Sequence, residues 1–286
     1  MTRRIAGAAA LLLAGAVALA GKTVLRPEPA REAAPDVGEA CRQTADWLGR
    51  RLDGEAVLVR PPYVLGGDLG PDGLLAQYSE ILVPAARALA AEHFATAPDE
   101  PITVLIFSDE ASYRRHARRL FDEAPTTRLG YYRPQLRTIV VNAAAGPAPL
   151  RHELTHALMA FDFPAAPDWL AEGLASLYED CRRDSGGRLL GETNWRLPVL
   201  QQAIRRRHLP SLGQLMDGET RAADARLWYA HTRYFCLFLQ YRNRLGPFYR
   251  ELRRGRSGSE ALARLYPDAS PAQIDGEFRA WVLQLR

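Results

Sequence analysis

The stretch His152-Glu153-Leu154-Thr155-His156, followed after a short loop by Trp169-Leu170-Ala171-Glu172-Gly173, decides how the rest of the chain is interpreted. Residues four apart lie on one face of a helix, so the imidazoles of His152 and His156 can bind one metal ion. Apolar residues fall on the opposite face, namely Leu150, Leu154, Ala157, Leu158 and Phe161. The pentapeptide therefore predicts a helix with one side in the core and one side that binds metal.

A catalytic zinc ion has three protein ligands and one open position. Met159 stands three residues after His156, so the extended pattern that ends in a third histidine is absent. Glu172 is the candidate third ligand, on a second helix that the loop over residues 161–166 brings antiparallel to the first. Inside that helix Gly173 costs about 1 kcal/mol relative to Ala. We expect it to be tolerated because the second helix approaches the first metal-binding helix closely.

Glu153 projects beside the ligand face without binding the ion. Zinc lowers the pKa of a bound water from its bulk value to about 7, and a neighbouring carboxylate can then take the proton. The sequence thus predicts Glu153 as general base and then general acid.

An acyl-transfer site also needs a hydrogen-bond donor for the developing oxyanion. We expect it from the stretch over residues 228–234, with Tyr229 first, His231 second and Arg233 as a contact to a carboxylate or carbonyl. The alternative for Tyr229 is an ordinary core aromatic residue. Asp168 either caps the second helix or supports a metal ligand.

The two quoted segments, read over residues 152–156 and 167–175, resemble the gluzincin branch of zinc metallopeptidases. They are most similar to bacterial peptidase MA-like proteins, many of which have no known function, and the similarity extends from about residue 55 to 244. The resemblance implies that His152, His156 and Glu172 bind zinc. It also implies that Thr138–Asn142 is the edge strand above the cleft, where an extended peptide would pair.

The chain departs from better-known gluzincins in two ways. The gap from His156 to Glu172 is shorter than in thermolysin-like enzymes and aminopeptidases, and the exopeptidase motif Gly-x-Met-Glu-Asn is absent. Their substrate rules are therefore not transferred, and the choice between endo- and exopeptidase stays open.

Hydrophobic periodicity predicts an α+β fold. We expect strands over residues 55–64, 102–107, 129–132 and 138–142, the last two as a hairpin, and a loop over 66–73. Helices are predicted over residues 36–52, 74–94, 110–121, 149–160, 167–179, 197–207, 222–244, 247–254, 259–266 and 271–285. The resemblance specifies this class as zincin-like, with a small mixed sheet, an edge strand above the metal-binding helix and a largely helical C-terminal half.

The N-terminus predicts export. Arg3 and Arg4 precede an uncharged run that ends at Ala18-Leu19-Ala20, a small-x-small pattern suited to signal peptidase. The run is short for a membrane span, which needs about 20 apolar residues, and this favours a cleaved signal peptide over a membrane anchor. We therefore expect a signal peptide or anchor over residues 1–20, a linker over 21–35, and one zincin-like domain over 36–286 whose helical subregion begins near 246. The folded part would be periplasmic, secreted, or anchored outside the cytoplasmic membrane.

The sequence adds expectations about charge, cysteines and the remaining histidines. The net charge is +4, but Lys22 is the only lysine, so the arginine excess indicates coding bias and we expect no nucleic-acid partner. Cys41 and Cys181 lie in polar surroundings and could pair in an oxidising compartment, whereas Cys236 is expected to be a buried small hydrophobe. His93, His116 and His208 have no partner at ligand spacing and are expected at the surface.

These observations favour an exported zinc-dependent metallopeptidase that acts on a peptide or protein. Two alternatives stay open: a non-catalytic envelope protein with a structural zinc, and a zinc hydrolase that acts on a cell-wall amide. The sequence does not decide the oligomeric state.

Overall fold

The computed structural model describes residues 36–122, 124–218 and 224–286. The predicted signal segment and linker, residues 1–35, lie outside the described residues. No described helix combines the length and the apolar character that a membrane span requires.

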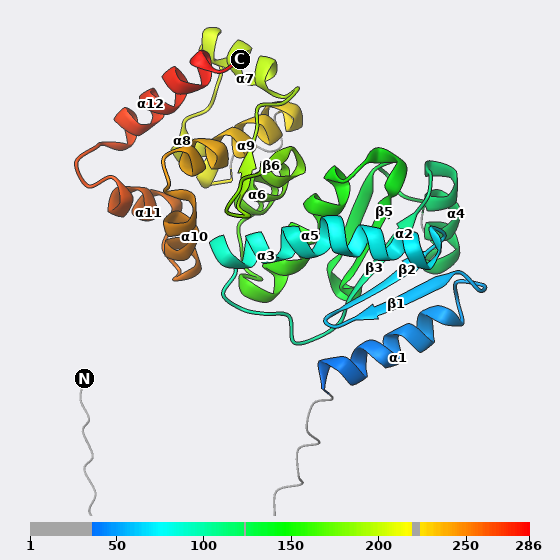
Figure 1. Ribbon diagram of the computed structural model, residues 1–286. Helices are drawn as coiled ribbons and strands as arrows, with labels where there is room; N and C mark the ends of the chain where they lie inside the picture. Colours follow the sequence, from blue (N-terminus) through cyan, green and yellow to red (C-terminus); the bar gives the residue numbers. More distant parts are fainter. Residues whose placement is uncertain (1–35, 123, 219–223) are drawn as a thin grey trace, which may run out of the picture. The chain divides into compact units, whose positions relative to one another are not determined.

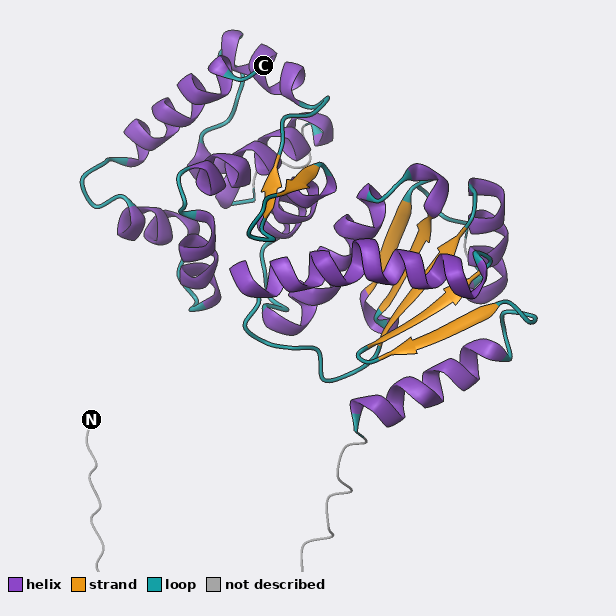
Figure 2. Ribbon diagram, viewed as in Figure 1, coloured by secondary structure: helices purple, strands orange, loops and turns teal. Residues whose placement is uncertain are grey.

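A five-stranded mixed sheet forms the first half of the fold (Figures 1 and 2). Its strands are β1 (Ala56–Arg60), β2 (Tyr63–Gly67), β3 (Ile102–Phe107), β4 (Gly130–Arg133) and β5 (Thr138–Asn142), in the spatial order β1-β2-β3-β5-β4. β2, β3 and β5 run parallel to one another, while β1 and β4 are antiparallel to their neighbours. The α+β prediction and the β4–β5 hairpin are confirmed.

Helices cover both faces of the sheet. Alternate side chains of a strand point to opposite faces, so Leu105 packs against α1 (Val37–Gly49) and α4 (Glu110–Phe121), while Val104 and Ile106 face the opposite way. That second face is covered by the helical run α2 (Gly70–Ala76), η1 (Gln77–Leu82) and α3 (Val83–Glu92), and by α5 (Ala148–Asp162). The sheet is therefore a buried middle layer.

The predicted helix over residues 74–94 is one continuous run with a π-helical centre, η1, directly before Pro84 in the first turn of α3. Proline lacks the N–H group and crowds the preceding turn, and a π-helical turn relieves this conflict. Short 3-10 turns, η2 (Pro134–Leu136) and η3 (Ala143–Ala145), flank β5.

The predicted strand over 55–64 is in fact two strands, β1 and β2, separated by Pro61 and Pro62. The expected loop that begins at Gly66 is also wrong, because Gly66 and Gly67 complete buried β2. A Cβ on Gly67 would lie 1.9 Å from the Ile106 carbonyl oxygen, and the residue has a φ of +147°. These glycines therefore serve close strand packing rather than a turn.

The expected edge strand is wrong as well. Thr138–Asn142 lies between β3 and β4, and Gly130–Arg133 is the strand at this edge of the sheet, with β1 at the opposite edge. β5 pairs in parallel with β3, which leaves only its outer side for the hairpin partner β4.

The second half of the chain is largely helical (Figure 1). It contains α6 (Asp168–Glu179), α7 (Leu197–Arg205), α8 (Leu212–Met216), α9 (Ala225–Tyr241), α10 (Leu245–Arg253), α11 (Gly258–Leu265) and α12 (Pro271–Gln284). A small hairpin, β6 (Cys181–Arg183) with β7 (Leu189–Gly191), was not predicted, and neither was α8. Buried α9 lies at the centre, and its apolar side chains join the core of α5 and α6.

All three cysteines are free thiols, so the Cys41–Cys181 pairing is wrong. Cys41 is buried between α1 and the sheet, whereas the Cys181 thiol donates to the Tyr178 carbonyl in the helical half. Cys236 is fully buried, as predicted.

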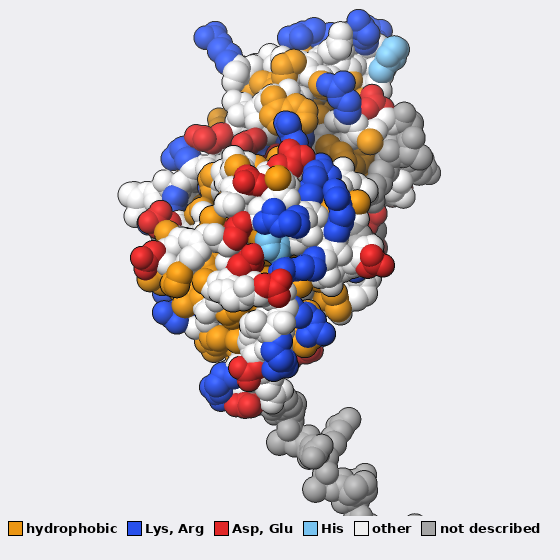
Figure 3. All heavy atoms as spheres, turned by 90° about the vertical axis from the view of Figure 1, so that its right-hand side faces the viewer, with side chains coloured by type: hydrophobic (Ala, Val, Ile, Leu, Met, Phe, Trp, Pro, Cys, Tyr) orange, Lys and Arg blue, Asp and Glu red, His pale blue; other side chains and the backbone are white. Residues whose placement is uncertain are grey.

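Figure 3 shows one face of the molecule, on which arginines lie among aspartates and glutamates. On this face the charges are not separated by sign.

Two of the three histidines expected at the surface are buried. His93 is 5% exposed and its Nε2 lies 2.6 Å from the Tyr178 hydroxyl, while the Nε2 of His116 lies 2.7 Å from Glu55 Oε1. Only His208 is exposed. The pattern around each histidine is local, and it does not reveal which distant element covers the ring.

Because two histidines are buried, we expect the free energy of unfolding to fall in mild acid. Burial, reinforced by nearby arginines, lowers the pKa of His93 and of His231 to about 3. Below the unfolded-state pKa of about 6.5 the unfolded chain binds these protons and the folded chain does not, so stability falls with pH between about 6.5 and 3. From pH 7 to 5.5 each ring should cost about 1 kcal/mol. Urea unfolding of His231→Phe at both pH values should show that much less loss than the parent, and an equal loss would contradict this account.

Candidate metal centre

Helix α5 has the predicted division into two faces. Leu150, Leu154 and Ala157 are buried in the core, while His152 and His156 are half-buried and line a cleft. The two imidazoles lie side by side, with 3.2 Å between their Nε2 atoms.

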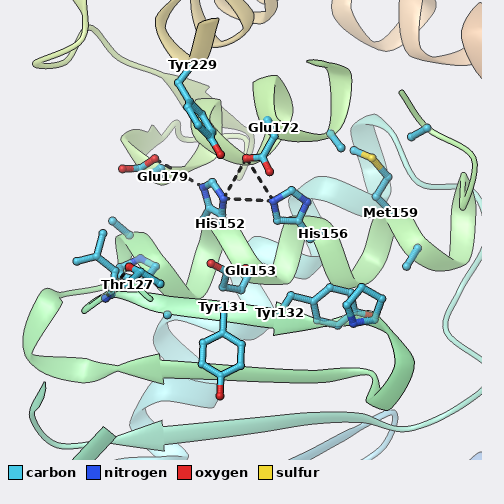
Figure 4. A pocket seen from close by; sticks show the side chains of 18 of the residues that line it. Thr127, Tyr131, Tyr132, His152, Glu153, His156, Met159, Glu172, Glu179 and Tyr229 are labelled. Carbon is cyan, nitrogen blue, oxygen red and sulfur yellow. Dashed lines mark hydrogen bonds and ion pairs between the residues drawn. The ribbon is translucent and has the colours of Figure 1, made fainter. Parts of the chain in front are cut away.

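Glu172 comes to the same point from α6. Its Oε2 atom lies 3.7 Å from the Nε2 of His152 and 3.7 Å from the Nε2 of His156 (Figure 4). Tetrahedral ligands at about 2.0–2.1 Å from zinc lie about 3.3 Å from one another. The triangle of two imidazole nitrogens and one carboxylate oxygen therefore has the dimensions of a zinc ligand set.

Glu153 also lies near this point. One of its oxygens falls within 4.8 Å of ligand nitrogens of both His152 and His156, which makes these three side chains a possible metal-binding group in their own right. Figure 4, however, shows Glu153 turned toward β4, on the side of the imidazoles away from Glu172. There the Tyr132 backbone N–H donates to its carboxylate. Glu172 is equidistant from the two nitrogens, whereas Glu153 is turned toward β4, so Glu172 is the better candidate for the third ligand.

The packing of α6 explains how Glu172 is presented. Leu170, Leu174 and Leu177 are fully buried and fix which side of α6 faces the core. A Cβ on Gly173 would lie 2.8 Å from Cys236 Sγ and 2.9 Å from the Thr232 carbonyl oxygen. The close approach expected of Gly173 is therefore real, but its partner is α9 rather than α5.

Asp168 is the first residue of α6, while Pro167 occupies the capping position and makes no side-chain cap. The capping role predicted for Asp168 is therefore wrong. Its charge in the first turn still favours the helix dipole.

Glu179 is a site residue that the sequence did not reveal. Its Oε2 lies 3.6 Å from His152 Nδ1, the imidazole nitrogen not directed at Glu172, and accepts a hydrogen bond of 3.2 Å from Arg196 Nη1. A carboxylate on the second nitrogen of a metal-binding histidine fixes the ring orientation. Glu179 follows Glu172 by seven residues, which is two helical turns along the same face, and this spacing could have identified it from the sequence. No sequence pattern indicates that Arg196 belongs to the site.

Electrostatics follow from this arrangement. Burial raises the pKa of Glu179, but its ion pair with His152 and the charges of Arg196 and Arg233 outweigh burial and hold the pKa below its ordinary value. Burial lowers the pKa of His152, yet the ion pair with Glu179 and the neighbouring carboxylates give a net upward shift. Glu153 is 9% exposed, and burial raises the pKa of its carboxyl against the charges of the two imidazoles.

The cleft has a volume of about 770 Å³ and lies between α5, α6, the edge strand β4 and the start of α9. Leu129 and Asn142 are joined by a backbone hydrogen bond, and such pairs alternate along an antiparallel ladder. The backbone groups of Gly130 and Tyr132 therefore face away from β5.

Tyr229 reaches into the cleft from α9, and Figure 4 shows its ring directed toward His152 and Glu172. The other two candidates from this helix are displaced. His231 is buried and stacks on Phe278, with 5.5 Å between ring centroids. Arg233 is fully buried and donates to the carbonyls of Asp180 and Glu192. Neither lines the cleft, because their positions on α9 point into the core. His231 as the second choice of donor, and Arg233 as a contact to a group in the site, are therefore wrong.

A scan against protein-family models finds no match, and no curated protein matches the sequence. A functional proposal therefore rests on the side chains of the candidate site.

Glu179→Gln should weaken zinc binding about 10- to 100-fold, because the amide orients His152 less strongly than the carboxylate does. Competition with a chromophoric chelator measures the affinity. Glu277→Gln is the matched control. Glu277 lies on α12 and forms an exposed ion pair with Arg242, so this variant should bind zinc like the parent. An affinity of Glu179→Gln within threefold of the parent would remove Glu179 from the site.

Proposed function

We propose that this chain is a zinc metallopeptidase of the gluzincin type, with a zincin-like fold, that hydrolyses peptide bonds. One observation carries the proposal: the triangle of His152, His156 and Glu172 has a second carboxylate, Glu153, beside it and opens on a cleft bordered by an edge strand. A site that only tied α5 to α6 would have no use for Glu153 or for the cleft. The N-terminal segment favours export of the enzyme.

In this proposal His152, His156 and Glu172 hold the metal. Bound zinc supplies a Lewis acid for the scissile carbonyl and lowers the pKa of water at the site. Two imidazoles and a carboxylate suit zinc, whose structural and catalytic sites prefer nitrogen, sulfur and carboxylate ligands.

Glu153 then moves the proton. It accepts a proton from the attacking water and passes it to the amine that leaves. A carboxyl whose pKa is raised by burial is better matched to this double role than an exposed one, because a general acid–base works best near the operating pH. The Tyr132 N–H fixes where its carboxylate stands.

The edge strand would hold the substrate. Gly130 and Tyr132 turn backbone groups away from β5, and an extended peptide can add to such an edge as a further strand. In this proposal β4 takes the role that the family resemblance implied for Thr138–Asn142.

Tyr229 is the proposed oxyanion donor, because its ring enters the cleft from the wall opposite β4 (Figure 4). Donors aimed at developing charge in a partly buried site stabilise the transition state more than the substrate.

Glu153→Gln should lower peptide hydrolysis by about 10²- to 10⁴-fold, the contribution typical of a general acid–base group, without loss of zinc. Cleavage of a peptide library followed by mass spectrometry, with zinc content measured on the same sample, tests this. Glu172→Gln is the control that should lose both. Full hydrolysis by zinc-loaded Glu153→Gln would refute the mechanism.

Zinc removal separates the proposal from a structural role. The apoprotein should keep cooperative thermal unfolding, because the apolar core between α5 and α6 does not need the metal. Collapse of the fold on chelation would indicate a structural zinc instead. Hydrolysis of cell-wall amides but not of peptides would favour the amidase alternative.

Tyr229→Phe should lower kcat by about 10²- to 10³-fold and change KM little, since the hydroxyl is needed only in the transition state. Tyr241→Phe, at a hydroxyl on the exposed end of the same helix, is the control. An unchanged kcat would leave Tyr229 as an ordinary packed aromatic.

A further inference from the structure

The two ends of the cleft differ in chemistry. Figure 4 shows Thr127 and Glu179 at one end and Met159 and Tyr132 at the other, with the two metal-site histidines between them. Arg196 belongs to the first end through its bond with Glu179. Apolar residues line both ends, Leu129, Ala145 and Pro149 among them where α5 begins. The ends therefore differ in charge: of the lining residues that the structure describes, charged side chains lie where α5 begins and none lies where α5 ends.

Helix α5 passes along the whole cleft. Ala148, His152, His156 and Ala160 follow one another at intervals of four residues, so they share one face. All four line the cleft. Ala148 lies one turn before the ligands and Ala160, which is exposed, lies one turn after them.

The uncharged end has the composition of a side-chain pocket. It is lined by Met159 and Phe163, by the small residues Ala160, Ala166 and Ala171, and by Pro164. The charged residues of the cleft lining, apart from the two histidines, are Glu153, Glu172, Glu179 and Arg196, none of them at this end. Alanine side chains leave room beside the larger Met159 and Phe163.

Both large residues suit a fixed pocket. Met159 is 3% exposed and so is held by the core, and its unbranched side chain adapts to irregular ligands. The Phe163 ring packs edge-on against Tyr249, with 6.0 Å between centroids. A charged group placed here would lose its hydration without gaining a partner, whereas an apolar group would lose contact with water.

We propose that this end of the cleft is a specificity subsite for a large apolar side chain, and that preferred substrates carry such a residue next to the scissile bond. The proposal rests on the proposed peptidase function, and it names the substrate class of that site. Met159, Phe163 and the three alanines determine the preference, and Ala160 is the position where the preference can be reversed.

Two readouts on the full-length protein test this. The first is the cleavage of a random peptide library, scored for the residues on both sides of the cut. The second is the equilibrium binding of short peptide hydroxamates, whose chelating group binds zinc, with Phe, Gly or Lys beside that group. The parent should bind the Phe probe at least about tenfold more tightly than the Gly probe, as burial of a large apolar side chain requires.

A matched pair of variants locates the effect. Ala160→Glu should shift the ratio of Phe to Lys binding by at least about tenfold toward Lys. Ala148→Glu, with the same charge at the mirror position on α5, should keep that ratio within about twofold of the parent. Both positions are solvent-accessible, so folding is retained, and thermal unfolding checks this.

The outcomes separate the two proposals. Cleavage without apolar preference, with equal binding of the Phe and Gly probes, overturns the subsite and leaves the peptidase intact. Apolar preference in binding without any cleavage supports the subsite and overturns the peptidase. An equal shift in Ala148→Glu and Ala160→Glu overturns the location of the subsite.

Discussion

The contact between α6 and α9 at Gly173 is the constraint on which the candidate site depends. The missing side chain lets α6 lie against the Thr232 carbonyl and the Cys236 thiol of α9. Glu172 directly precedes Gly173 on α6, and its position beside the imidazoles follows from that depth of packing. α9 also carries Tyr229 into the cleft. One helix contact in the core therefore sets the relative positions of the third candidate ligand and the candidate oxyanion donor. A larger residue at 173 would move both without touching either.

The candidate site carries more carboxylates than cationic side chains. Glu153, Glu172 and Glu179 lie around the two imidazoles, and among the described residues that line the cleft Arg196 is the only arginine. With neutral imidazoles the carboxylates are in excess, and burying such an excess is unfavourable unless a cation offsets it. A divalent ion held where the candidate ligand atoms converge would offset this excess. Arg233 is buried in the core and does not line the cleft, but its charge helps to hold the pKa of the Glu179 carboxyl below its ordinary value.

Individual helices and strands could be predicted from local patterns in the sequence. Helix α5, with His152 and His156 on one face, and the β4–β5 hairpin follow from periodicities of a few residues, and the structure has both. Long-range pairing was not readable in this way. Which strand of the hairpin is at the edge depends on β5 pairing with β3, and the link from Glu179 to Arg196 joins segments that no spacing rule connects. His93 and His116 were misplaced for the same reason, because distant elements bury them. Gly66 and Gly67 were misread because glycine serves close packing in strands as well as turns.

The shortness of β4 has a consequence for what the proposed enzyme can hold. The strand spans only Gly130–Arg133, and a turn that begins at Pro134 ends it. Of the two residues whose backbone faces outward, Tyr132 already gives its N–H to Glu153. A bound chain would thus form very few main-chain hydrogen bonds, far fewer than a full additional strand. Selectivity must then come from side chains, and the chain that enters has to be extended over only a few residues, as in a loop or an unfolded terminus. Regular secondary structure in a target protein would protect it from cleavage regardless of its sequence.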